Sequence, residues 1–310
     1  MGIDTNQCFP RYCWDFANLI HANAGRAVFV GGCIRDIKLG ISTQDFDVEV
    51  FGIEQERLQA ILEKHFKHIN LFGQKFGVYK IKNPPLDVSL PRTEIIIGCK
   101  HRDFSVHLNP YLSYEEAARR RDFTVNTMGF DILANTLLDP FHGENDLSQA
   151  TLRHVSTHFA EDALRVLRGM QLAGRFGFKL ADETQALCQS MSPQALSEQK
   201  IFEEFYKLFS KSSKPSRGLI FLERVNWLRY FGPLYECQQK FPSEWLSILH
   251  AIDQASRGQA SCELVYAILL TRLQNLHLAT EEFFQKWITN GKILKKVLRK
   301  AQELRSNQGD

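Results

Sequence analysis

The chain has 310 residues, of which 44% are hydrophobic and 24% are charged, as is ordinary for a globular protein. No apolar run reaches the roughly 20 residues of a membrane span, and the N-terminus lacks a signal-peptide pattern, so we expect a cytoplasmic protein that does not enter a membrane. The formal net charge of +3 predicts that affinity for nucleic acid would come from local patches. The seven cysteines are scattered and never form a C-x-x-C pair, which disfavours a disulfide framework and a zinc site.

Predicted helices and strands alternate in the first part of the chain. Apolar residues three and four apart predict helices, and short runs of β-branched and aromatic residues predict strands. In chain order these are a helix over residues 12–25, a strand over Ala27–Val30, a helix and turn over Ile37–Gly40, a strand over Phe46–Val50 and a helix over Glu54–Phe66. The runs Gly77–Lys82 and Leu86–Leu90 flank Asn83-Pro84-Pro85 and predict a hairpin.

The remaining segments predict a change of architecture. Residues 91–112 are polar and irregular, which predicts a surface loop, and the capping-box spacing of Ser113 and Glu116 predicts a helix start. Phe130–Leu138 predicts a last pair of strands, and from residue 148 onward every periodic segment is helical. We therefore expect an α+β fold whose parts are a head with a mixed sheet over residues 1–147, a helical neck over 148–215 and a helical body over 216–310.

The stretch Val28–Val50 combines two patterns that carry chemistry. A strand that leads into Gly31-Gly32 at a helix start places backbone N–H groups where a phosphate can bind. Arg35, one helical turn later, adds a charged guanidinium group that can bind the same anion through two N–H donors. Asp45 and Asp47 are two apart, so on a strand their carboxylates leave the same face and can hold Mg²⁺. Either pattern alone is more often an ordinary turn or a solvated acidic pair. Together, in this order, they favour a triphosphate site beside a metal site.

The same residues resemble the first motif of a known family. The form GGxxRDxxxG followed by DxD is similar to that of the nucleotidyltransferases of the tRNA CCA-adding and bacterial poly(A) polymerase group, and the matching residues are Gly31, Gly32, Arg35, Asp36, Gly40, Asp45 and Asp47. Three later strings resemble further motifs of that family, RRDFTxN at residues 120–126, DPxxGxxDL at 139–147 and EDxxRxxR at 161–168. The resemblance covers roughly the first 210 residues well and the C-terminal part weakly.

The resemblance implies a palm-like nucleotidyltransferase head with Mg²⁺ as its cofactor. Asp45 and Asp47 would hold the metal, and Asp87, a carboxylate between apolar neighbours on the second hairpin strand, would complete the catalytic set. The nucleotide-binding residues in the head would be Gly31, Gly32, Arg35, Asp36, Arg120, Arg121, Asp122 and Asn126, with the arginines at the triphosphate and Asp122 and Asn126 at the ribose. Residues 91–112 resemble a mobile loop that helps to select the second kind of nucleotide.

A second predicted site would read the nucleotide base. The spacing of Asp162, Arg165 and Arg168 places them on one helical face, so an acceptor and a donor can point at one ligand. Cytosine and adenine both present an amine donor beside a ring-nitrogen acceptor, whereas uracil and guanine present the opposite pattern and would be rejected. The alternative is a surface salt bridge between residues three apart, which is common.

We expect an enzyme that adds CCA to tRNA 3′ ends from CTP and ATP. A poly(A) polymerase, an enzyme restricted to C or to A, and a non-catalytic RNA-binding protein are the alternatives. The predicted last helix, Lys292–Arg305, has one apolar and one basic side, and the basic side is a candidate contact for the tRNA backbone. Trp245–Ala255 faintly resembles the start of a His-Asp metal-dependent phosphohydrolase domain, but no His-Asp pair follows, so we expect no metal there.

Overall fold

The structure is a computed structural model that describes residues 8–71, 73–96, 104–257 and 261–306. The chain divides into two compact units, residues 1–161 and 162–310. Within the described residues, no helix is both long and apolar enough to cross a membrane. The first unit combines a mixed sheet with helices and the second is helical, so the α+β prediction is confirmed.

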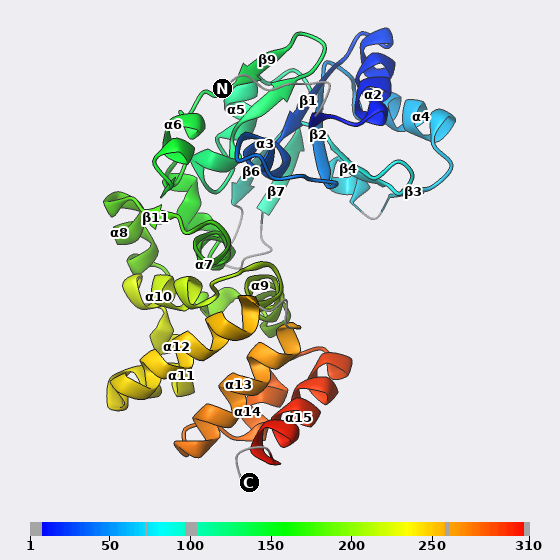
Figure 1. The fold of residues 1–310 in the computed structure, drawn as a ribbon. Coiled ribbons are helices and arrows are strands. Elements are labelled where there is room, and N and C mark those ends of the chain that lie inside the picture. The colour runs from blue at the N-terminus through cyan, green and yellow to red at the C-terminus, as the bar shows by residue number, and fades with distance from the viewer. Residues whose placement is uncertain (1–7, 72, 97–103, 258–260, 307–310) are drawn as a thin grey trace. The chain divides into compact units, whose positions relative to one another are not determined.

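A seven-stranded sheet organises the first unit, with the strand order β3-β4-β5-β2-β1-β8-β9 (Figure 1). Its strands are β1 (Arg26–Val30), β2 (Phe46–Phe51), β3 (Ile69–Asn70), β4 (Val78–Ile81), β5 (Leu86–Ser89), β8 (Gly129–Asp131) and β9 (Thr136–Leu138). The β2–β5 pair is parallel and the other neighbouring pairs are antiparallel. The predicted hairpin and the predicted last strand pair are therefore confirmed.

Helices and turns complete the first unit. They are α2 (Arg11–Ala22), α3 (Gly32–Lys38), α4 (Gln55–His65), α5 (Tyr114–Ala118), α6 (Gly143–Ser148), and the short 3₁₀ turns Gln74–Phe76, Thr124–Asn126 and Thr157–Glu161. The predicted capping box is present, because the Ser113 side chain accepts from the Glu116 N–H at 3.2 Å and the Glu116 carboxylate accepts from the Ser113 N–H at 2.9 Å. The helix start predicted from two residues is thus confirmed.

The core of the first unit lies on both faces of β1. Phe29 contacts the ring of Phe9 at a centroid distance of 5.2 Å, next to α2, which packs on this strand. Val28 and Val30, which alternate with Phe29, pack with Ala117 of α5. This two-sided burial holds the end of β1 firmly, and the next residue is the first glycine of the Gly31-Gly32 pair.

The segment 91–112 differs from its prediction. Instead of an irregular loop it contains β6 (Arg92–Ile96) and β7 (Phe104–Leu108), which pair in antiparallel fashion as a separate two-stranded sheet. The sequence FSVHL does alternate apolar and polar residues, but the neighbouring charged residues obscured this strand signal. Residues 97–103, which include most of the predicted mobile loop's charges, lie outside the described residues.

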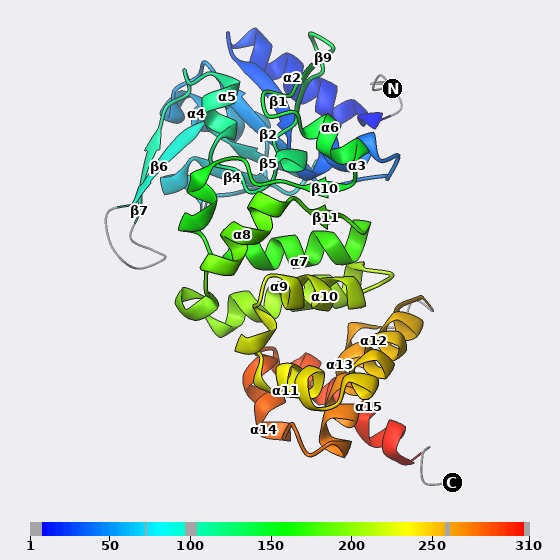
Figure 2. The same cartoon turned by 90° about the vertical axis from the view of Figure 1, so that its left-hand side faces the viewer.

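The second unit is built from helices, as predicted. They are α7 (Leu164–Phe176), α8 (Asp182–Ser190), α9 (Glu198–Lys211), α10 (Ser216–Arg224), α11 (Gly232–Lys240), α12 (Pro242–Arg257), α13 (Cys262–Asn275), α14 (Glu281–Trp287) and α15 (Gly291–Ser306). Here α7 packs against α9 and α10, and α13 packs against α12 and α15 (Figure 2). Two-residue strands at Thr151–Leu152 (β10) and Lys179–Leu180 (β11) are the departure from the all-helical expectation after residue 148.

Candidate active site

The strand register brings the predicted phosphate-binding turn and the predicted metal-binding aspartates together. Val30, the last residue of β1, pairs with Asp47 of β2, so the Gly31-Gly32 turn begins beside Asp47. On the other side of β2, Asp47 lies opposite Asp87 of the parallel strand β5. One end of the sheet therefore carries residues from three separate parts of the sequence.

Gly31 has a backbone conformation that favours glycine, and it lies close to the guanidinium group of Arg121. Its φ of 77° lies in the left-handed region, where a side chain is strained. A Cβ atom at this position would also lie 3.2 Å from Nη1 of Arg121. Because α3 begins at Gly32, the first backbone N–H groups of that helix point out of its end, which is the arrangement that favours an anion. The first and second sequence motifs thus meet at this turn.

Two arginines of the second motif are held by a buried carboxylate. Glu49 of β2 is fully buried, and its two oxygens accept from Nη2 of Arg120 at 3.0 Å and from Nη2 of Arg121 at 3.1 Å. Arg121 also donates through Nη1 to the Asn126 carbonyl at 3.3 Å. Burial by itself would lower the pKa of Arg121, but the carboxylates of Glu49 and Asp47 more than offset this and raise the pKa. Arg121 therefore stays charged at the glycine turn.

A second polar network links α3 to the loop that follows Arg121. Arg35 is buried and donates to the Asp36 carboxylate at 2.7 Å and 2.9 Å and to Oδ1 of Asn126 at 2.5 Å. Asn126 in turn donates to Oδ1 of Asp122 at 3.0 Å. These predicted nucleotide-binding residues therefore bind one another and fix the glycine turn to the second motif. Their direct contacts with phosphate and ribose stay predictions.

The aspartates line a cleft of about 400 Å³ at the same end of the sheet, together with one lysine; its lining residues are Asp45, Phe46, Asp47, Lys80, Ile81, Pro85, Leu86 and Asp87. Asp45 is exposed and directly precedes β2, which begins at Phe46 as predicted, and Asp47 lies within the strand. Asp47 opens to solvent on one side, yet protein atoms around its carboxylate raise its pKa by partial desolvation. The Asp87 carboxylate raises that pKa further, while Arg121 and Lys80 oppose the change.

The donors in the cleft fit a divalent metal ion bound by two carboxylates. Mg²⁺ prefers oxygen ligands and is commonly held by one or two carboxylates, with waters and substrate phosphates completing its octahedron. Asp45 and Asp47 supply such a pair. Among the described residues, however, no three acidic, histidine or cysteine side chains converge as a metal site, and Asp87 forms an ion pair with Lys80. Asp87 is thus adjacent to the pair and is held by another partner.

The predicted base-reading residues lie at the start of α7 in the second unit. Asp162 precedes this helix, where its Oδ1 accepts from the Leu164 N–H at 2.9 Å and its carbonyl accepts from the Arg165 N–H at 3.0 Å. Asp162 therefore lies outside α7, two residues before its first residue, and the prediction that its side chain and that of Arg165 point at one ligand stays a prediction. Arg165 is buried within α7 and Arg168 is exposed. Their role in reading a base stays a prediction.

Comparison with known proteins agrees with these motifs. The family model for the poly A polymerase head domain matches residues 27–153. The CCA-adding enzyme of Pseudomonas entomophila (strain L48) is 34% identical over 261 residues, which cover 81% of this chain and 67% of that protein. The chain belongs to the tRNA nucleotidyltransferase and poly(A) polymerase family. This family generally uses divalent metal ions, in keeping with the donors of the cleft.

Other relatives of this chain are longer than it is. The multifunctional CCA protein of Xylella fastidiosa (strain M23) is 35% identical over 214 residues, which are 67% of this chain but 50% of that protein. The chain thus spans about half the length of the multifunctional relatives it matches. The solved Bacillus stearothermophilus CCA-adding enzyme in complex with CTP has a TM-score of 0.75 at 23% identity and covers 95% of this chain and 69% of its own. That likeness shows a shared fold.

Two residues at the candidate site were not predicted from the sequence, Glu49 and Lys80. Glu49 follows Asp45 and Asp47 at the same spacing of two in DFDVEV, so strand periodicity could have placed it on their face. Lys80 lies opposite Asp87 in the hairpin that was predicted, so pairing of that hairpin could have located it.

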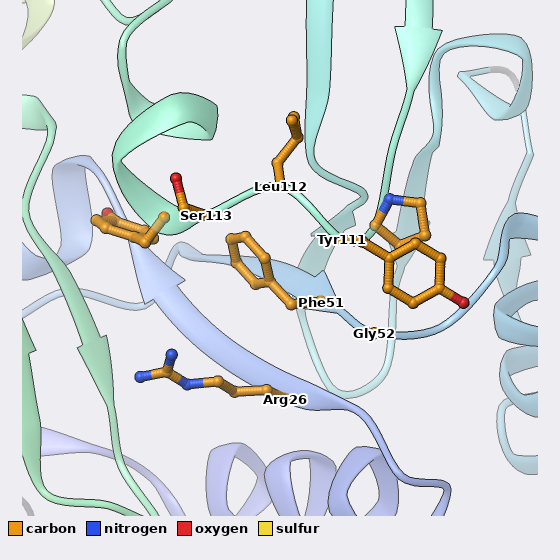
Figure 3. A pocket seen from close by; sticks show the side chains of 8 residues that line it. Arg26, Phe51, Gly52, Tyr111, Leu112 and Ser113 are labelled. Atoms are coloured by element: carbon orange, nitrogen blue, oxygen red, sulfur yellow. The ribbon is translucent and has the colours of Figure 1, made fainter.

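A second pocket of the head lies at the other end of β1 and β2. Arg26 and Phe51, which pair with each other at that end, line it together with residues of the segment before α5 (Figure 3). Arg26 is already bound to Asp131 at 2.7 Å. None of the residues predicted for the active site lines this pocket, so the cleft at Asp47 is the candidate for the nucleotidyltransferase reaction.

Proposed function

We propose that this protein is a template-independent RNA nucleotidyltransferase that adds CCA to tRNA 3′ ends from CTP and ATP in the cytoplasm. The observation that carries the proposal is the meeting of Asp47, the Gly31 turn and the charged Arg121 at one end of the sheet. These groups suit a metal ion, an anion and the charge that develops on a phosphate. Relatives named as CCA-adding enzymes support the choice of tRNA, CTP and ATP as substrates.

In the proposed reaction the 3′-hydroxyl of tRNA attacks the α-phosphate of the nucleotide, which forms a phosphodiester bond and releases pyrophosphate. Bound Mg²⁺ would lower the pKa of the hydroxyl and neutralise charge on the phosphate oxygens. Asp45 and Asp47 would hold the metal ion in the cleft, and Asp87 would support them from the neighbouring strand. Arg121, with Arg120 beside it, meets the triphosphate at the turn of Gly31 and Gly32.

The remaining predicted residues would orient the nucleotide. Arg35, Asp36, Asp122 and Asn126 hold the two motifs together, and Asp122 and Asn126 would also meet the ribose. Base choice would come from the start of α7, where the Asp162 carboxylate accepts from the amine of C or A and Arg165 donates to the adjacent ring nitrogen. The exposed Arg168, one turn further along, would add charge for the triphosphate.

Product length and composition test this proposal. Purified full-length protein is incubated with tRNA that lacks CCA, with Mg²⁺ and with CTP, ATP or both, and the products are separated on a denaturing gel. We expect CTP alone to add only C residues and the two nucleotides together to give one discrete product ending in CCA. A ladder of unlimited length with ATP alone, or no extension with any nucleotide, would refute CCA addition.

A poly(A) polymerase is the second candidate, because the head-domain family model that matches this chain is described by that activity. The two enzymes would share the chemistry of Asp45, Asp47 and Arg121, so mutations in the head do not separate them. The ATP-only reaction does separate them, since only a poly(A) polymerase extends a primer processively with A alone.

A further inference from the structure

Lys80 lies in a row with two of the cleft's aspartates across three neighbouring strands. In the antiparallel β4–β5 pair, Lys80 is opposite Asp87, and in the parallel β2–β5 pair, Asp87 is opposite Asp47. Residues directly opposite one another in a sheet project from the same face. The side chains of Asp47, Asp87 and Lys80 therefore leave the sheet side by side, on the face that forms the cleft.

The alternation of burial fixes Lys80 on this face. Its neighbours Tyr79 and Ile81 are buried, as are Leu86 and Val88 on either side of Asp87. A shift of β4 by one residue would expose these apolar side chains and bury the lysine, at a large cost in free energy. Lys80 is thus held at the carboxylates by the core packing of its own strand.

The ammonium group of Lys80 makes an ion pair with the carboxylate of Asp87. Nζ of Lys80 donates to Oδ2 of Asp87, and the two side chains are 59% and 40% exposed. The pair is therefore in contact with water and can open without disturbing the core. Asp87 already has a positively charged partner, and a metal ion that used this carboxylate would have to displace it.

We propose that Lys80 is a positioning residue that keeps Asp87 as its counter-ion and so limits the metal site of the free protein to Asp45 and Asp47. A divalent cation entering the cleft competes with the lysine for Asp87. Metal binding is consequently weak until nucleotide phosphates supply further oxygen ligands, so that metal and nucleotide bind together. This inference rests on the proposed metal-dependent transfer and adds to it a residue that sets metal affinity.

Binding of Mn²⁺ to the full-length protein, in the absence of nucleotide and RNA, tests the inference. Free Mn²⁺ is measured by electron paramagnetic resonance for wild type, Lys80→Met, Asp87→Asn and the double variant. Lys80→Met should tighten Mn²⁺ binding by about fivefold, the order of magnitude expected for releasing an exposed ion pair. In the Asp87→Asn background the same change should have an effect below about twofold.

A matched control removes a positive charge elsewhere in the head. Lys75 is exposed in the turn Gln74–Phe76, and Lys75→Met should leave Mn²⁺ affinity unchanged. Equal gains from Lys80→Met with and without Asp87 would overturn the inference, because Lys80 would then act only through its general charge. The inference would also be overturned if Lys80→Met did not raise Mn²⁺ affinity in either background. If neither wild type nor Lys80→Met bound Mn²⁺, the metal site itself would be refuted. Mn²⁺ binding without nucleotide transfer would instead contradict only the proposed function.

Discussion

The two halves of the candidate site are built in opposite ways. Arg120 and Arg121 form ion pairs with Glu49, which is fully buried, whereas Asp45 and Asp47 line an open cleft. The arginine half depends on the fold for its geometry, because a buried charge needs its partners. The aspartate half presents ligands that the fold itself does not use. Substitutions of the aspartates should therefore reduce activity without reducing stability. Substitutions in the arginine half should reduce stability as well.

The largest expected effect is on the aspartate half. Asp45→Ala and Asp47→Ala should each reduce nucleotide transfer by at least about 10³-fold, because each removes a metal ligand and with it charge stabilisation of the transition state. The thermal melting temperature should stay close to that of wild type. Activity above about a tenth of wild type in either variant, with a normal melting temperature, would refute the assignment of that residue as a metal ligand.

The arginine half should respond in its stability. Glu49→Ala leaves two arginines without their buried carboxylate and should lower the free energy of unfolding by about 3–5 kcal/mol, measured by urea denaturation. Glu49→Gln keeps one oxygen acceptor and should lower the free energy of unfolding by less than Glu49→Ala does. Glu115→Ala is a suitable control, since its ion pair with Arg119 is exposed and is worth about 1 kcal/mol or less. Equal losses for Glu49→Ala and Glu115→Ala would contradict the role of Glu49 as the buried partner of both arginines.

Selectivity is the next effect in size. If Asp162 reads the base edge, Asp162→Ala should relax the preference for CTP and ATP over UTP by roughly tenfold to a hundredfold, because the penalty for a mismatched polar group disappears. Incorporation of all four nucleotides on a tRNA primer measures this. A uniform loss for every nucleotide at an unchanged ratio would limit Asp162 to a structural role, in line with its bond to the Leu164 N–H.

The smallest effect concerns the raised pKa of Asp47. The Asp47 pKa is higher in the folded state than in the unfolded state. The folded protein therefore loses stability as the pH rises between these two pKa values, because only the folded form still binds the proton there. Without divalent ions, Asp47→Asn should therefore be more stable than wild type near neutral pH, by about 0.5 kcal/mol or less after screening by solvent. The difference should vanish as pH falls below the ordinary aspartate pKa of about 4. A gain that persists at low pH would have another cause.

Local patterns in the sequence predicted most of the fold. The strand before Gly31, the hairpin around Asp87 and the capping box at Ser113 each depend on residues close together in the chain, and each is present. The strands β6 and β7 were missed because charged residues between them suggested a loop. The spacing predicts Asp162 on the helix, but the residue precedes α7, and its side chain accepts from the Leu164 N–H.

The partners of the site residues could be predicted only in part. Glu49 contacts arginines that are 71 and 72 residues away in the sequence, so no local pattern identifies its partners. A buried glutamate within a strand conflicts with burial preferences until those arginines are placed beside it. Arg35 was predicted to bind phosphate from its position one turn after Gly31, yet its bonds to Asp36 and Asn126 emerge only from the assembled fold.

Transfer of labelled CMP from CTP to a tRNA that lacks CCA tests the central claim most directly, with wild-type protein assayed in Mg²⁺ and again after chelation by EDTA. The account predicts rapid labelling of the tRNA in Mg²⁺, no labelling in EDTA and full recovery when Mg²⁺ is restored, because Asp45 and Asp47 act through a bound metal ion. A correctly folded protein that binds the tRNA but transfers no CMP in Mg²⁺, or that labels it equally in EDTA, would contradict the account.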